Sequence, residues 1–156
     1  MNKPGAKPPT ILIIDDNEDD YEAVVRAFKK MGLGNPLSHC TTGLTAMEFL
    51  QSSGGGETAQ AGIPALILLD LNMPGMDGHK VLQLIKADER LKRIPVIIWT
   101  TSSNDKDINA CYLSGANAYM QKPPTFEALL VSVKRLKEYW LETALLPNDA
   151  LDRLNN

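Results

Sequence analysis

The sequence predicts an α/β protein built on one open, doubly wound sheet of five parallel strands. Two observations support this expectation. Short continuous apolar runs alternate with longer stretches in which apolar residues recur every three or four positions, and five such pairs follow one another. The length of 156 residues, with 44% hydrophobic and 22% charged residues, fits one domain with a single core.

The first two units occupy the first third of the chain. The run from Thr10 to Ile14 predicts a strand, and the helical spacing from Glu18 to Met31 predicts the helix that follows it. Asn35-Pro36 indicates a turn into a weaker second strand at Leu37 to Cys40, and a helix from about Leu44 to Gln51 completes this unit.

The third unit follows the glycine-rich stretch from Ser52 to Ala61, which we expect to be a mobile connection. Ala65 to Leu69 predicts a continuous apolar strand. In the loop after it, Gly75 and Gly78 are expected to adopt backbone conformations that are costly for other residues. Asp77 is positioned to cap the next helix, whose apolar stripe comprises Val81, Leu82 and Ile85.

The last two units complete the domain. In chain order, we expect a strand at 96–99, a helix from 105 to about 114 capped by Ser103 or Asn104, a strand at 118–120 and a helix from 125 or 126 to about 141. This last helix could extend to Leu146, because Pro147 stops it. The sequence therefore predicts a flexible segment at 1–9, one domain at 10–141 and a C-terminal extension at 142–156.

Composition limits the functions to consider. The formal net charge is −3 and no basic run occurs, so nucleic-acid binding is not expected. No apolar stretch approaches the roughly 18 residues of a membrane span, and the first residues do not resemble a signal peptide, which predicts a cytoplasmic protein. Cys40 and Cys111 lack metal-ligand spacing with His39 or His79, so we expect reduced structural thiols.

Polar residues suited to chemistry follow four of the five predicted strands. Asp15 and Asp16 follow the first strand, Asp70 follows the third, Thr100 the fourth and Lys122 the fifth. In an open parallel sheet with strand order 2-1-3-4-5, the functional crevice lies at the carboxyl ends of these strands. Each acid alone would suit a helix cap equally well, but together they favour a functional site.

The three acids predict a cation site. Carboxylates forced within several Å of one another repel by several kcal/mol at an effective dielectric constant of about 20. Hard oxygen ligands suit Mg²⁺ or Mn²⁺ better than zinc. Such an ion would also offset the charge of an incoming phosphoryl group, with Lys122 as a second positive charge and Thr100 as a hydroxyl donor.

With these residues, the chain resembles a CheY-like receiver domain, the (βα)5 flavodoxin-like module of two-component response regulators. The resemblance rests on Asp15-Asp16, on Asp70 in LLDLNMPGMDG, on Thr100 and on Lys122-Pro123, and it spans about residues 10–141. It implies a single-domain phosphoprotein of a phosphorelay, not an enzyme in the usual sense, in which Asp70 accepts a phosphoryl group from the phosphohistidine of a sensor histidine kinase. Slow self-catalysed phosphotransfer and dephosphorylation would accompany this role.

The resemblance also implies individual roles. Asp16 would bind the metal directly and Asp15 mainly through water, with Asp70 and the main-chain carbonyl of Asn72 as further ligands. Thr100 and Tyr119 would be the switch residues, and Lys122 would pair with the carboxylate and then with the phosphoryl group. The Lys122-Pro123 bond would be cis. Signalling would then proceed through protein–protein contacts with a downstream target.

Three further features are similar to the small regulators paired with phytochrome-type histidine kinases: the segment TTSSNDKDI, the triglycine stretch and the apolar tail. This similarity implies signalling in response to light and a homodimer to which the tail contributes through Trp140, Leu141, Leu145 and Leu146. The alternative is that these four side chains complete the core.

Two alternatives from other classes remain at this point. A phosphohydrolase with an aspartyl-phosphate intermediate usually has a second acid two residues after the nucleophile, where this chain has Asn72. A receiver-like scaffold that never accepts a phosphoryl group would not need the complete set of Asp70, Thr100 and Lys122.

Overall fold

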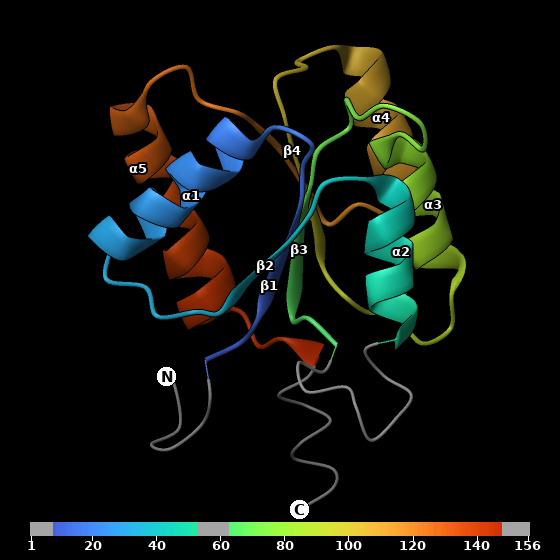
Figure 1. Ribbon diagram of the computed structural model, residues 1–156, viewed down its shortest axis with the longest axis horizontal. Helices are drawn as coiled ribbons and strands as arrows, with labels where there is room; N and C mark the ends of the chain where they lie inside the picture. The colour runs from blue at the N-terminus through green and yellow to red at the C-terminus, as the bar shows by residue number, and fades with distance from the viewer. Residues whose placement is uncertain (1–7, 53–62, 148–156) are drawn as a thin grey trace, which may run out of the picture.

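The computed structural model describes residues 8–52 and 63–147. Its centre is a sheet of five strands in the order β2-β1-β3-β4-β5, with every neighbouring pair parallel. The predicted fold class and strand order are therefore confirmed (Figure 1). The strands are β1 (Ile11–Ile14), β2 (Leu37–Cys40), β3 (Leu66–Leu69), β4 (Val96–Thr100) and β5 (Ala118–Gln121).

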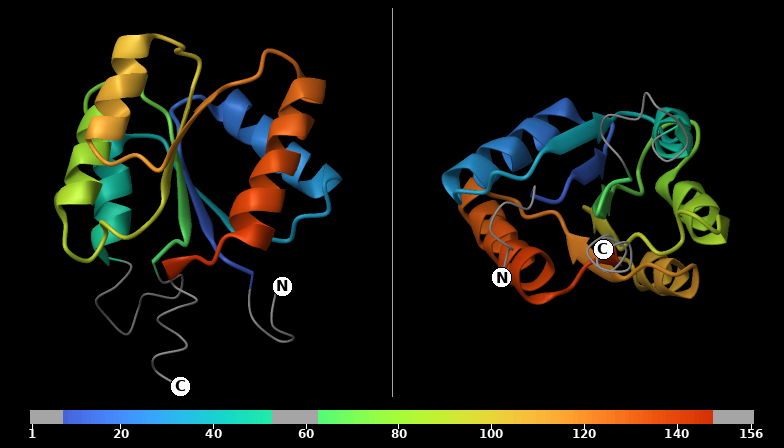
Figure 2. Two further views of the ribbon diagram at one scale, coloured as in Figure 1. Left: turned by 180° about the vertical axis from the view of Figure 1, so that it is seen from behind. Right: turned by 90° about the horizontal axis from the view of Figure 1, so that it is seen from below.

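Helices cover both faces of this sheet. Figures 1 and 2 show α1 and α5 together on one face, and α2, α3 and α4 on the other. Such two-sided cover is what the alternation of strands and helices predicts. The helices are α1 (Glu18–Lys30), α2 (Gly43–Ser52), α3 (Gly78–Ala87), α4 (Asp105–Leu113) and α5 (Phe126–Leu136).

The central strands are apolar throughout because both of their faces are buried. In β1, Leu12 and Ile14 pack into the cluster under α2, α3 and α4, whereas Ile11 and Ile13 pack into the cluster under α1 and α5. Every residue of β1, β3 and β4 is buried. A strand that faces helices on both sides therefore appears in the sequence as a continuous apolar run.

Polar side chains cap the helices that begin at the carboxyl edge of the sheet. Asn17 accepts a hydrogen bond from the N–H of Asp20 at the start of α1, and Asp77 accepts one from Lys80 at the start of α3. The capping role of Asp77 was expected. Asn104 caps α4 and Thr125 caps α5 in the same way. These caps fix the points at which the chain turns from strand to helix.

The last helix differs from the expected single α-helix to about Leu141. α5 ends at Leu136, and the chain continues as a π-helix, η1 (Lys137–Thr143), with five-residue hydrogen-bond spacing. The N–H of Ala144 bonds to the carbonyl of Tyr139 in this spacing. A seven-residue segment is too short for its apolar spacing to separate the two kinds of helix, so the sequence did not predict the change.

The apolar tail divides into buried and exposed side chains. Trp140 and Leu141 pack against the cluster under α1 and α5, and Leu146 is 3% exposed. Tyr139 and Leu145 remain 57% and 72% exposed. Three of the four side chains expected to contribute to a dimer are therefore partly or fully covered within the chain, in accord with the alternative of core completion.

Some expectations fall on segments that the structure does not describe. The N-terminal segment at 1–7, the glycine-rich connection at 53–62 and the end of the tail at 148–156 lie outside the described residues. In residues 8–52 and 63–147, none of the helices has the length and apolar character that a membrane crossing requires.

Candidate functional site

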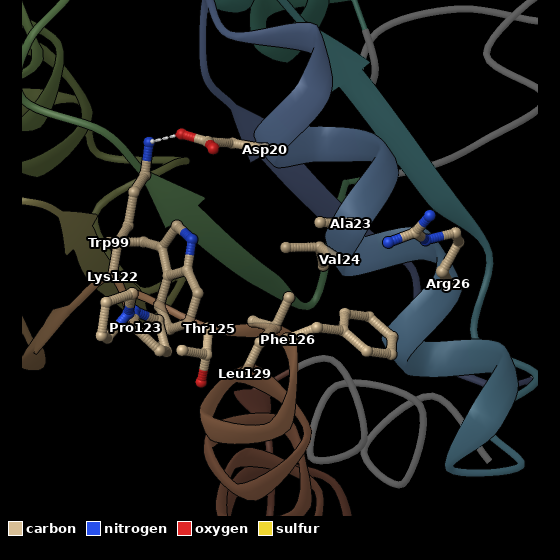
Figure 3. A pocket seen from close by; sticks show the side chains of 11 residues that line it. Asp20, Ala23, Val24, Arg26, Trp99, Lys122, Pro123, Thr125, Phe126 and Leu129 are labelled. Carbon is tan, nitrogen blue, oxygen red and sulfur yellow. Dashed lines mark hydrogen bonds and ion pairs between the residues drawn. The ribbon is translucent and has the colours of Figure 1, made fainter.

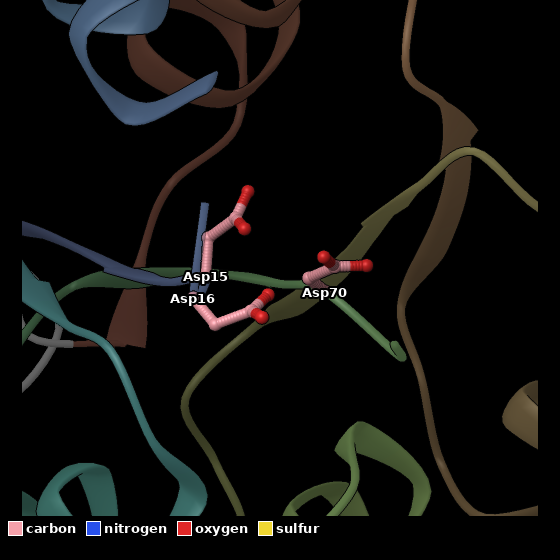
Figure 4. Close-up of side chains that lie close together, drawn as sticks. All are labelled: Asp15, Asp16 and Asp70. Carbon is pink, nitrogen blue, oxygen red and sulfur yellow. The ribbon is translucent and has the colours of Figure 1, made fainter. Parts of the chain in front are cut away.

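The acids that follow β1 and β3 meet at the carboxyl edge of the sheet. The parallel register pairs Ile14 with Leu69, so Asp15 and Asp70 leave neighbouring strands at the same level. Carboxylate oxygens of Asp15, Asp16 and Asp70 all lie within 4.8 Å of one another (Figure 4). Asp15 and Asp70 are buried, whereas Asp16 is exposed. The predicted convergence of the three acids is confirmed, with one acid open to solvent.

Lys122 reaches this cluster from the end of β5. Its ammonium lies 2.8 Å from Oδ2 of Asp15 and 3.2 Å from Oδ2 of Asp70. A third carboxylate, that of Asp20 in α1, lies 2.8 Å from the same nitrogen (Figure 3). An ammonium has three protons, so each can be donated to a different carboxylate. Lys122 is thus held at three points while its side chain is 8% exposed.

Asp20 is the residue of this site that the sequence analysis missed. It is one of three acids in the first turn of α1, where acids favour the positive end of the helix dipole. Nothing in the sequence distinguishes it from its neighbour Asp19. The packing angle of α1 on the sheet turns Asp20 toward Lys122, and that angle cannot be read from local spacing.

The site holds more negative than positive charge, and this affects its proton equilibria. Burial alone would lower the pKa of Lys122, but the ion pairs with Asp15 and Asp20 outweigh burial and raise it. The pKa of Asp15 is raised, because burial disfavours its charged form more than Lys122 favours it. A further cation near these three buried or half-buried carboxylates would therefore offset the negative charge that the single ammonium leaves unbalanced.

The backbone around Asp70 fixes its carboxylate. Oδ1 accepts the N–H of Asn72 at 3.2 Å, which leaves Oδ2 to Lys122. Gly78 lies against this segment, and a Cβ there would come within 2.1 Å of the Asp70 carbonyl oxygen. Gly75 has the expected positive φ, of 76°. The expectation that Gly78 adopts such a conformation was wrong, because its φ is not positive. Glycine is needed there because the backbone of Asp70 leaves no space for a Cβ.

Thr100 is the last residue of β4 and is fully buried. Its hydroxyl oxygen accepts the side-chain amide of Asn72 and the N–H of Ser102, each at 3.4 Å. Its carbonyl accepts the N–H of Lys122 at 2.7 Å, which joins the end of β4 to the loop after β5. The direction of the main-chain carbonyl of Asn72 is not fixed by these contacts, so its role as a metal ligand stays a prediction.

Tyr119 lies in β5 and is partly buried against the cluster under α2, α3 and α4. Its hydroxyl donates a 2.9 Å hydrogen bond to the carbonyl of Ser102. The pKa of Tyr119 is raised, mainly by burial. The expected aromatic side chain is therefore present next to the β4–α4 loop, and its ring is anchored to that loop.

One expectation about the β5–α5 connection was wrong. The described residues contain no cis peptide bond, so the bond between Lys122 and Pro123 is trans. Beside this bond, a pocket of about 200 Å³ opens between α1 and the start of α5 (Figure 3). Its lining includes Trp99 and Phe126, and the guanidinium of Arg26 lies 5.0 Å from the centre of the Phe126 ring.

Known proteins are similar to this chain in sequence. The chain is 39% identical over 147 residues to the response regulator Rcp1 of Synechocystis sp., which covers 94% of this chain and 99% of that protein. It is 39% identical over 134 residues to the probable methanogenesis regulatory protein FilR2 of Methanothrix harundinacea, with 86% and 84% covered.

A solved structure agrees with these sequence relatives. The phosphorylated cyanobacterial phytochrome response regulator RcpA matches with a TM-score of 0.82 and 38% identity, over 90% of this chain and 99% of that one. A structure of Rcp1 with bound Mn²⁺ is also similar. In this chain, the cluster of Asp15, Asp16 and Asp70 is a group of carboxylates that could hold a metal ion.

The family model described as "Response regulator receiver domain" matches residues 11–134. This range contains the whole sheet, the acid cluster, Thr100 and Lys122. The match, the relatives and the site geometry agree on one conclusion: this chain belongs to the family of response regulator receiver domains.

Proposed function

We propose that this receiver domain is a phosphorylation-dependent response regulator whose phosphoacceptor is Asp70. The observation that carries the proposal is that the Asp70 carboxylate lies within 4.8 Å of carboxylate oxygens of Asp15 and Asp16 and 3.2 Å from the ammonium of Lys122. A carboxylate oxygen of Asp70 attacks the phosphorus of a kinase phosphohistidine. The P–N bond breaks, the histidine nitrogen keeps its electron pair, and an acyl phosphate forms.

We assign the metal site to Asp15, Asp16, Asp70 and the main-chain carbonyl of Asn72, with Asp15 acting mainly through water. A bound Mg²⁺ or Mn²⁺ would offset the charge of the carboxylates and of the phosphoryl oxygens. The exposed position of Asp16 supports direct binding, because this residue is accessible to the solvent from which a hydrated ion arrives. Burial, with a smaller contribution from the charge of Asp70, raises the pKa of Asp15, and a nearby cation would favour the ionised form of this carboxylate.

Lys122 and Thr100 respond directly to the new phosphoryl group in this proposal. Phosphorylation adds about −1.5 to −2 charge units and three acceptor oxygens. Lys122 is already within 3.2 Å of Asp70 and pairs with these oxygens, while the Thr100 hydroxyl donates to them. Tyr119, anchored to the adjacent loop, carries the change toward α4 and β5. A downstream protein then binds the altered surface.

The chain lacks the second acid that a phosphohydrolase with an aspartyl-phosphate intermediate usually has. Asn72 stands two residues after Asp70, and its side-chain amide donates to Thr100. An amide has no proton to exchange in the range where a general acid or base works. This supports a phosphoryl group that is held, rather than one that is hydrolysed in a catalytic cycle.

We propose a sensor histidine kinase of the phytochrome type as the phosphodonor. The similarity to Rcp1 and to the phytochrome response regulator RcpA supports this choice, and it covers nearly the full length of both. The signal would then be light, and the exchange would take place in the cytoplasm. We also propose a homodimer, with Tyr139 and Leu145 as the exposed apolar side chains of the tail that contribute to it.

A small phosphodonor tests the phosphoacceptor assignment. With Mg²⁺, the wild-type chain is expected to gain one phosphoryl group by intact mass, and Asp70→Asn is expected to gain none. Asp19→Asn is the matched control, because it removes an exposed charge from the same edge of the molecule. Labelling of the Asp70→Asn variant would remove Asp70 from this role. Rapid release of phosphate by the wild type, with no labelled form detectable by intact mass, would favour the phosphohydrolase instead.

A further inference from the structure

A second polar network lies beside the phosphoacceptor site and joins the β4–α4 loop to α3, α4 and β5. The Ser102 hydroxyl donates to Oδ2 of Asp107 at 2.7 Å, and Nε2 of His79 lies 3.3 Å from Oδ1 of the same carboxylate. The carbonyl of Ser102 accepts the Tyr119 hydroxyl, and its N–H donates to the oxygen of Thr100. Ser102 therefore connects Asp107 in α4 with both expected switch residues.

The contacts favour one arrangement of protons for a neutral His79 ring. An ionised carboxylate only accepts, so Nε2 of His79 is the nitrogen that donates to Asp107. In the neutral ring Nδ1 is then the acceptor, and it lies 3.8 Å from the sulfur of Cys111. Burial raises the pKa of Cys111 to about 11, so this thiol keeps the proton that it donates. The hydrogen bond from Ser102, and then that from His79, lower the pKa of Asp107 and keep it ionised.

This network determines what the hydroxyl of Thr100 can do. Its oxygen has two acceptor positions, and both are filled, one by the Asn72 amide and one by the N–H of Ser102. Because both acceptor positions are occupied, the hydroxyl can bind a third partner only by donating its proton to it. In the proposed function that partner is a phosphoryl oxygen on Asp70.

Helix capping does not account for these contacts. The cap of α4 is Asn104, whose side chain accepts the N–H of Lys106. Asp107 lies beyond this cap and uses both oxygens on side chains of the loop and of α3. The helix dipole accounts for an acid in the first turn of α4, but not for the two side-chain partners of Asp107, one in the loop and one in α3.

We propose that Asp107, held by His79, is a positioning residue for the switch: through Ser102 it fixes the loop so that Tyr119 stays bound to the loop and Thr100 keeps its proton for the phosphoryl group. This inference rests on the proposed function for its consequence, but not for its geometry. Charge-assisted hydrogen bonds are the strong ones, so the Asp107 carboxylate is expected to dominate the conformation of the loop.

The test uses full-length chains labelled with fluorotyrosine, in which the Tyr119 signal is identified by Tyr119→Phe. In the metal-free protein, Asp107→Ala and Ser102→Ala are expected to move the Tyr119 fluorine resonance in the same direction. Asp107→Asn, which keeps an acceptor oxygen, and Ser102→Thr, which keeps the hydroxyl, are expected to restore it in part. The matched control is Asp105→Ala, which removes an exposed acid from the same turn of α4.

The second readout is the rate of labelling by a small phosphodonor with Mg²⁺. Asp107→Ala and Ser102→Ala are each expected to slow it by about tenfold, the effect of losing one charge-assisted hydrogen bond. The double variant should be no slower than either single variant, because both changes break the same connection. His79→Gln is expected to give a smaller effect in the same direction.

The two readouts separate the failure of this inference from that of the proposed function. If the wild type is not labelled, the proposed function fails, and the Tyr119 resonance still tests the network. If the wild type is labelled but Asp107→Ala matches Asp105→Ala in both readouts, the inference is overturned. Additive effects of Asp107→Ala and Ser102→Ala would also overturn it. If Asp107→Ala does not fold, as judged by circular dichroism, Asp107→Asn and Ser102→Ala decide the outcome.

Discussion

The ammonium of Lys122 lies 2.8 Å from Oδ2 of Asp20, a residue that precedes it by 102 positions in the chain. This contact joins the first turn of α1 to the end of β5 across the phosphoacceptor edge. The ammonium is nearer to Asp20 and Asp15 than to Asp70, from which it is 3.2 Å away. Before phosphorylation, Asp20 and Asp15 therefore hold the ammonium at shorter distances than the phosphoacceptor does.

The first prediction concerns the strength of this contact. The Asp20 side chain is 42% exposed, so solvent screens the pair and Asp20→Asn should lower the free energy of unfolding by less than about 1 kcal/mol. Urea denaturation in the absence of Mg²⁺ measures this. Asp19→Asn removes an acid from the same helical turn and controls for the helix dipole. A larger loss for Asp20→Asn than this limit would mean that the pair behaves as a fully buried one.

The second prediction concerns the metal. Asp16→Ala should weaken Mg²⁺ binding by at least about tenfold, since even groups outside the ligand shell contribute that much to metal sites. Titration calorimetry gives the affinity, and Asp19→Ala is the control for the loss of one charge nearby. Unchanged affinity in Asp16→Ala would place the ion elsewhere. Urea denaturation without metal should show little change in Asp19→Ala, whose side chain is exposed, and no loss of stability in Asp16→Ala, which removes a charge that repels Asp15 and Asp70.

The third prediction is a pH dependence that arises from Cys111. Burial raises its pKa from 9.0 in the unfolded chain to about 11 in the folded one. Between these values the unfolded chain loses the thiol proton and the folded chain keeps it, so stability falls as pH rises and the effect is absent below the lower value. Alkylation of Cys111 by iodoacetamide at pH 9 should accordingly be far slower in the folded chain than in urea.

Comparison with a variant isolates this thiol. Cys111→Ala leaves a cavity and is less stable throughout, but its free energy of unfolding should decline less steeply than that of the wild type between pH 9.0 and about 11. If the free energies of unfolding of the two proteins fall equally steeply with pH, another group causes the loss of stability at alkaline pH. Cys40, whose pKa burial also raises, remains in both chains and contributes equally to each.

The sheet and most of the site were accessible from the sequence because they depend on short segments. A continuous apolar run indicates a doubly covered strand, and the residue after it lies at the functional edge whatever the rest of the chain does. Asp15, Asp70 and Thr100 were predicted on this basis, and they lie together in the structure. Lys122 follows the same rule at β5.

The contacts that were missed all join separate elements. Asp20 meets Lys122 only because of the angle at which α1 packs, and Asp107 meets His79 only because α4 lies beside α3. Neither contact has a local signal, since acids near the start of a helix are equally suited to its dipole. The change from α5 to a π-helix was missed because it alters hydrogen-bond spacing and not the apolar pattern.

The fourth prediction concerns Gly78. A methyl group there would meet the carbonyl oxygen of Asp70 at 2.1 Å, so Gly78→Ala must displace the backbone of one of the two segments. We expect a loss of stability of about 1–3 kcal/mol and slower labelling of Asp70. Gly34→Ala is the control, because a Cβ at Gly34 meets no atom within 4 Å and its φ is not positive. Normal labelling in Gly78→Ala would show that the displacement spares the phosphoacceptor.

The fifth prediction separates the two interpretations of the tail. Leu145 is 72% exposed and Leu146 is 3% exposed, so the two neighbours should respond differently to serine. Leu146→Ser should lower the free energy of unfolding by about 2–5 kcal/mol, as polar replacement of a buried leucine removes core contacts. Leu145→Ser should leave stability unchanged and shift sedimentation toward monomer, alone or with Tyr139→Ser. If both surface variants sediment like the wild type, the tail contributes to the core of the chain and not to a dimer.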